Sequence, residues 1–66
     1  MKLFYDVRNK NRKLVAKLYP DTGLVISVHK KQIQTVELAV GKKTIIERDG
    51  VETQITRISE TEYIIA

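Results

Sequence analysis

The sequence contains no cysteine and no tryptophan, and only one histidine and one proline among 66 residues. Without cysteine no disulfide can form, and a single imidazole would need several carboxylate co-ligands to hold a metal. A chain this short buries only about 60% of the surface that it exposes when unfolded. Because the usual reinforcements of a small scaffold are missing, we expect a homo-oligomer and no metal or other cofactor.

Long apolar runs are also absent. Asp6 interrupts the first apolar stretch well before the roughly seven to fifteen residues of a signal peptide. No window approaches the run of about 20 apolar residues that a membrane span requires. Since a chain without cysteine also suits a reducing compartment, we predict a cytoplasmic protein with no membrane partner.

Catalytic patterns are missing too. The three glycines, Gly23, Gly41 and Gly50, are isolated in turns and form no phosphate-binding loop. Ser27 and His29 share one strand face, but side chains two apart in a strand stand nearly 7 Å apart and point in parallel. We therefore predict a solvated polar face at Ser27 and His29, no enzymatic activity and no small-molecule substrate.

What the sequence does contain is a regular series of turn signals about every ten residues, which is typical of a meander of short strands. The segments between the turns are rich in Val, Ile, Thr and Tyr, which suit a half-buried pleated surface. The sequence thus predicts a single all-β domain over residues 1–66, an antiparallel meander of six or seven strands in a small barrel or curved sheet. The predicted strands span residues 2–8, 13–19, 24–29, 33–40, 44–48, 51–58 and 62–65.

Two of the turns carry strong signals. Asp49-Gly50 is a favoured two-residue hairpin turn, because glycine accepts the positive φ that it requires. It would place Glu47 and Glu52 opposite each other on a charged outer face. In residues 20–23, Pro20 fixes φ, the Asp21 side chain can bond its own backbone, and a glycine supplies a left-handed position.

The segment 32–40 admits two interpretations. Ile33, Val36 and Val40 have helical spacing, and Gly41 could end a short helix. Alternation of Val36, Leu38 and Val40 favours a strand instead, with Ile33 out of phase and marking a bulge. We favour the strand.

The first hairpin has a register in which one face is entirely apolar or aromatic. A reversal at residues 10–11 pairs Leu3 with Leu18, Tyr5 with Ala16, and Val7 with Leu14. Other apolar residues then have the wrong parity for the core and form a second, exposed apolar surface of the kind that marks an interface. These residues are Phe4, Val15, Tyr19, Val25, Ile45 and Ile64.

Charge is unevenly distributed along the chain. Residues 1–31 hold eight basic and two acidic residues, a net of +6, whereas residues 32–66 hold four and six, a net of −2. Alternate turns of a meander lie at the same end of the sheet, so the turns near residues 10 and 30 should form one basic rim. The rim would comprise Lys10, Arg12, Lys13, Lys30 and Lys31, with Lys42 and Lys43 at the far end beside Asp21 and Glu60.

Two functions fit these features. The favoured one is binding to another protein, in which an apolar face with Phe4, Val15 and Tyr19 supplies burial and the basic rim supplies steering. The alternative is nucleic-acid binding, with aromatic side chains on bases and the cations Lys10, Arg12, Lys13, Lys17, Lys30 and Lys31 on phosphates. In size and in a Lys/Ile/Glu/Thr-rich composition without Cys or Trp, the chain resembles small accessory proteins of phages and mobile elements in Gram-positive bacteria.

Overall fold

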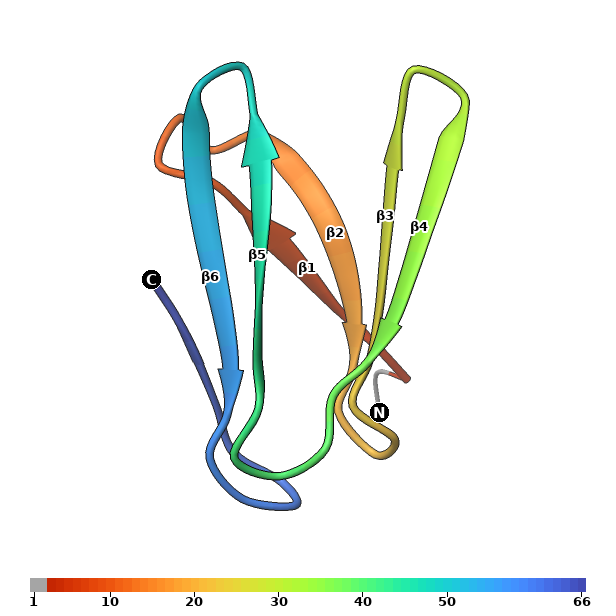
Figure 1. Ribbon diagram of the computed structural model, residues 1–66, viewed down its shortest axis with the longest axis vertical. Helices are drawn as coiled ribbons and strands as arrows, with labels where there is room; N and C mark the ends of the chain where they lie inside the picture. Colours follow the sequence, from red (N-terminus) through yellow and green to blue (C-terminus); the bar gives the residue numbers. More distant parts are fainter. Residues whose placement is uncertain (1–2) are drawn as a thin grey trace.

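The computed structural model describes residues 3–66 and contains seven strands and no helix in that range (Figure 1). Each strand corresponds to one of the seven predicted segments, so the all-β prediction is confirmed. Residue 2 of the first predicted strand lies outside the described residues. The strands are β1 (Tyr5–Arg8), β2 (Leu14–Tyr19), β3 (Leu24–His29), β4 (Gln32–Glu37), β5 (Lys43–Arg48), β6 (Val51–Arg57) and β7 (Tyr63–Ile65).

The strands form two antiparallel meander sheets rather than one closed barrel. β1 to β4 pair in sequence order in a four-stranded sheet, and β5 to β7 pair in a three-stranded sheet. The two sheets share one apolar core, in which Val7, Leu18 and Val25 from the first sheet meet Ile46 and Ile55 from the second. The β3–β4 hairpin extends to one side of this core, and β4 lies farthest from β6 (Figure 1).

Two tight hairpin turns have left-handed backbone at both central residues. In the β5–β6 turn, Asp49 has φ of 54° and Gly50 of 81°, as the Asp-Gly signal predicts. In the β3–β4 turn, Lys30 and Lys31 have φ of 49° and 65°, although neither residue relieves the steric cost of that conformation as glycine does.

The segment 32–40 is a strand only as far as Glu37, and it contains no helix. The expected bulge at Ile33 is wrong, because Ile33 pairs with Val28. The pairing of β3 with β4 runs without a shift from Leu24–Glu37 to His29–Gln32. Beyond the strand, the Leu38 amide donates to the Gly23 carbonyl at 2.8 Å, and the chain then crosses to the second sheet. The alternation of Val36, Leu38 and Val40 that predicted a strand therefore spans the end of β4 and the start of the connection to the second sheet.

The register of the first hairpin differs from the predicted one by two residues. Tyr5 pairs with Leu18, and the register then shifts between Val7 and Arg8. The cause lies in the turn, where the Asn9 side chain accepts from the amides of Asn11 at 2.9 Å and Lys13 at 3.1 Å. From Tyr5 to Val7 the shift of two keeps each side chain on its predicted face, and Val7, Ala16 and Leu18 lie in the core. Beyond the shift, Arg8 pairs with Leu14, and Leu14 is exposed, so the predicted apolar face holds only in part.

Two arginines of the second sheet link it to the first. At one end, the buried Arg57 donates from Nη1 to the carbonyl of Leu38 at 2.9 Å and from Nη2 to that of Glu60 at 2.9 Å. At the other end, Nη2 of Arg48 donates to the Ser27 hydroxyl at 3.1 Å. Each guanidinium joins segments that are distant in sequence, so these side chains fix how the sheets pack.

Candidate protein-docking surface

Strand β3 presents its more apolar side to the surface. Its inward positions hold Val25, which is 2% exposed, and the buried Ser27. Side chains alternate along a strand, so Leu24, Ile26 and Val28 point away from the core. Val28 is 56% exposed. A strand that only had to pack on the core would have the opposite arrangement, with its apolar residues inward.

The surface side of the first sheet, which we call the outer face, continues this apolar character onto the neighbouring strands. On β4, Ile33 is 68% exposed and pairs directly with Val28. A groove of about 330 Å³ is lined by residues of β2 and β3, including Tyr19 and Ile26. We define the outer face as Phe4, Lys17, Tyr19, Leu24, Ile26, Val28, Ile33 and Thr35.

The aromatic residues predicted for this face contact each other. The ring centroids of Phe4 and Tyr19 are 5.5 Å apart, and both residues are half-buried. The Lys17 ammonium lies 4.6 Å from the centroid of the Phe4 ring. This contact is a cation–π interaction that occupies one face of the ring, so Phe4 is already stacked within the chain.

Two other residues assigned to the second apolar surface are in the core. Val15 is 2% exposed and Val25 is equally buried, so the prediction that their side chains are exposed is wrong. Val15 nevertheless lines the groove beside Tyr19 and Ile26. Val15 follows the register shift of the first hairpin, where a simple alternation no longer holds. Ile45 and Ile64 are exposed, on the surface side of the second sheet.

Sequence reasoning missed the most exposed apolar residues of the outer face. The signal was available in the turn at residues 20–23, because a four-residue loop makes Tyr19 the partner of Leu24. Leu18 then pairs with Val25 on the core side. Extending that register along β3 and β4 would have placed Val28 and Ile33 outside.

The turns that carry the predicted basic rim do lie at one end of the molecule (Figure 1). Their residues Lys10, Arg12, Lys13, Lys30 and Lys31 are all exposed. The β5–β6 turn, with Asp49, lies at the same end and adds negative charge there (Figure 1). Alternate turns of a meander lie at the same end of the sheet. The rule that placed the turns near residues 10 and 30 together therefore also predicts that the turn at residues 49–50 lies beside them.

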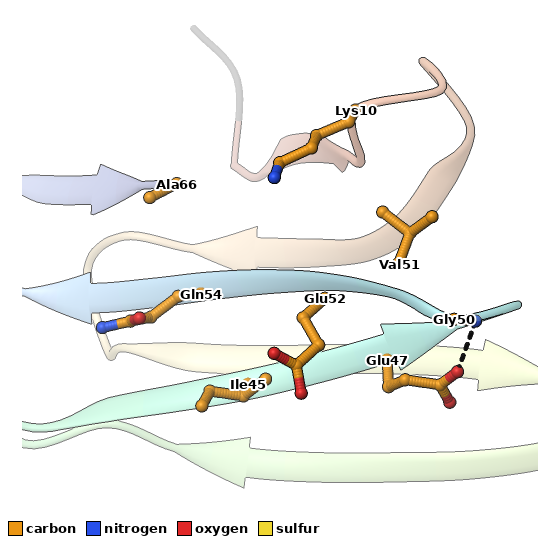
Figure 2. A pocket seen from close by; sticks show the side chains of 8 residues that line it. All are labelled: Lys10, Ile45, Glu47, Gly50, Val51, Glu52, Gln54 and Ala66. Carbon is orange, nitrogen blue, oxygen red and sulfur yellow. Dashed lines mark hydrogen bonds between the residues drawn. The ribbon is translucent and has the colours of Figure 1, made fainter.

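A second groove, of about 510 Å³, borders β6 and contains Lys10 from the rim. Figure 2 shows Lys10 extending from the β1–β2 turn on one side of β6, and Ile45 and Glu47 on the other side in that view. Glu47 and Glu52 pair across the hairpin, as predicted. Glu47 also accepts from the Gly50 amide at 2.6 Å, so one of the two carboxylates serves the turn.

The Ser27 hydroxyl is engaged inside the protein and does not belong to a solvated face. It donates to the Val15 carbonyl at 2.7 Å and accepts from Arg48 at 3.1 Å. His29 is exposed at the end of β3. The described residues contain no cluster of three or more potential metal ligands, and no helix within residues 3–66 is long and apolar enough to cross a membrane.

Comparison with known proteins adds no relative from which a function could be transferred. No family model matches the chain, and no curated protein or solved structure matches it either.

Proposed function

We propose that the chain is a non-catalytic β-module that binds another protein in the cytoplasm, in an accessory or inhibitory role. The partner docks on the outer face. The orientation of β3 carries the proposal, because Leu24, Ile26 and Val28 face outward while Ser27 is buried. Covering apolar surface contributes about 25 cal/mol per Å², and a partner recovers that free energy at this face.

Several contacts favour a protein over a nucleic acid on the outer face. Proteins that bind single-stranded nucleic acids stack bases on the free faces of aromatic rings. In this protein the Lys17 ammonium already lies 4.6 Å from the centroid of the Phe4 ring and covers one face of it. Lys17 is the cation in the predicted phosphate set that belongs to this face, and the other members lie in turns at one end. An apolar surface with one cation suits a protein partner with an acidic residue at its edge.

The engagement of Ser27 supports the non-catalytic part of the proposal. A serine nucleophile needs a hydroxyl that is exposed to substrate and held by a base. The Ser27 hydroxyl is buried between Val15 and Arg48. Its contacts connect the sheets and leave it no access to a substrate.

Single substitutions at two residues of similar exposure test the docking surface. Val28, on the outer face, and Ile45, on the second sheet, are 56% and 53% exposed, so Val28→Lys and Ile45→Lys should both leave the fold intact. The wild type and both variants are cross-linked in cells and their bound proteins identified by mass spectrometry. We expect one partner to be kept by the wild type and Ile45→Lys and lost by Val28→Lys. Equal retention by both variants would contradict the proposal.

Nucleic-acid binding is the competing outcome. A labelled single strand and a labelled duplex are titrated with the protein at two salt concentrations. We expect no tight binding even at low salt. Tight binding with a steep salt dependence is the result of phosphate contacts and counterion release, and it would overturn the protein-binding proposal.

A further inference from the structure

Strand β4 has an open edge along its whole length. It is the last strand of its sheet, and all six of its residues are exposed. The Leu38 amide donates to the carbonyl of Gly23, the residue just before β3, so by alternation the amides and carbonyls of Gln32, Gln34 and Val36 also point to β3. Those of Ile33, Thr35 and Glu37 point the other way, where no strand of residues 3–66 pairs with them.

Over residues 32–36 this edge lacks the features with which proteins usually block strand addition, such as charge, proline or a bulge. The opposite edge strand, β1, has two of them: Asp6 and Arg8 are charged, and the register shifts between Val7 and Arg8. From Gln32 to Val36, β4 has no charged residue, no proline and no register shift. The contrast between the two edges of one sheet marks β4 as the edge open to pairing.

The charges at the two ends of β4 select the partner strand. The strand begins after Lys30 and Lys31 and ends at Glu37. In a parallel arrangement of two copies, like charges meet. In an antiparallel arrangement, the lysines of each copy meet Glu37 of the other, so β4 is electrostatically complementary to itself.

We propose that two copies of this chain pair antiparallel through β4 and form a continuous eight-stranded sheet. A two-fold axis perpendicular to the sheet keeps both outer faces on the same side and passes midway between one residue of β4 and the same residue of the second copy. An axis at Gln34 places Lys31 opposite Glu37 of the second copy and Ile33 opposite Thr35. An axis at Thr35 would instead oppose Ile33 to Glu37, so the charges favour Gln34.

The backbone of the β3–β4 turn is consistent with this use of its lysines. Lys30 and Lys31 both have positive φ, a conformation that is sterically unfavourable for a residue with a Cβ. Asn-Gly would form the same turn with less strain. Strain of this kind persists at functional positions, and in the dimer Lys31 contributes an ion pair at each end of the joined strands.

This inference deepens the proposed function, since the dimer joins two outer faces into one docking surface, but the two are tested separately. Cysteine substitution reads the register directly because the natural chain has none. Gln34 opposes itself in a non-hydrogen-bonded pair, in which Cα atoms are about 4.5 Å apart and a disulfide can form. Gln32 opposes Val36 instead. We expect Gln34→Cys to form a disulfide-linked dimer on mild oxidation, whereas Gln32→Cys does so only when mixed with Val36→Cys.

Light scattering on the protein without cysteines tests the charge argument. The wild type should show a dimer that dissociates on dilution, as expected for a small interface. Glu37→Lys should raise the dissociation constant about tenfold, and the double variant K31E/E37K should restore it. A monomeric mass at every concentration, or self-linking of Gln32→Cys rather than Gln34→Cys, would overturn the dimer. Partner capture lost by Val28→Lys would still support the docking surface in that case.

Discussion

Gly23 is the residue at which the β2–β3 turn, the end of β4 and Arg57 come together. Its φ is +78°, and a Cβ built on it would meet the Leu38 carbonyl oxygen and Nη1 of Arg57, the latter at 2.7 Å. The same two groups are joined by the Arg57–Leu38 hydrogen bond of 2.9 Å. Glycine is therefore needed at position 23 both for its conformation and for its lack of a side chain.

Gly41 provides a matched control for the steric part of this requirement. It has φ of +88°, but nothing lies within 4 Å of a Cβ at that position. Gly41→Ala should thus lower the free energy of unfolding by about 1 kcal/mol, the cost of the left-handed backbone. Gly23→Ala should cost about 2 kcal/mol more because overpacking is added. Urea denaturation measures both, and equal losses would show that Gly23 makes no close contact.

At the scale of single elements, the β3–β4 hairpin combines an unfavourable turn with an outward apolar strand. Replacing Lys30-Lys31 by Asn-Gly keeps the positive φ of the turn but lowers its steric cost, and it should raise the free energy of unfolding by about 1 kcal/mol. Thermal unfolding monitored by circular dichroism at a fixed low concentration, where the chain is monomeric, measures the change. A lower melting temperature would mean that the two lysines stabilise the isolated turn.

The same elements show how far the sequence predicts the fold. The bounds of β3 follow directly from its flanking turns, because Pro20 to Gly23 and Lys30 to Lys31 interrupt the apolar pattern on both sides. The orientation of β3 was not predicted, since apolar alternation was assumed to face the core. Here the stronger alternation faces outward, as it does where a strand serves an interface.

Long-range contacts account for what local patterns did not predict. The packing of the second sheet against the end of the first includes Arg57, whose Nη1 donates to the Leu38 carbonyl, 19 residues away in sequence. No pattern of spacing indicates that an arginine will be buried. For the docking surface, the sequence identified Phe4, Lys17 and Tyr19, but the more exposed Val28 and Ile33 required the strand register.

At the scale of the whole molecule, the two sheets leave the β3–β4 hairpin with little cover. The described chain extends over 30 × 20 × 20 Å, and β6 lies away from β4 (Figure 1). On the inner side, Gln32 and Gln34 of β4 line a small pocket with Ile46 and Arg48 of β5. The open edge and the most exposed apolar residues of the outer face, Val28 and Ile33, belong to this hairpin. A partner on the face and a second copy on the edge can therefore bind together, because the side chains of Val28 and Ile33 are perpendicular to the hydrogen-bonding direction of β4.

The central claim is that the β3–β4 hairpin carries the binding surfaces of this protein. Hydrogen–deuterium exchange of the wild type, alone and bound to the partner that cross-linking identifies, tests it most directly. We predict that binding slows exchange in residues 24–37 and leaves residues 43–57 of the second sheet unchanged. Protection confined to residues 43–57, or to the basic turn at residues 9–13, would contradict the account.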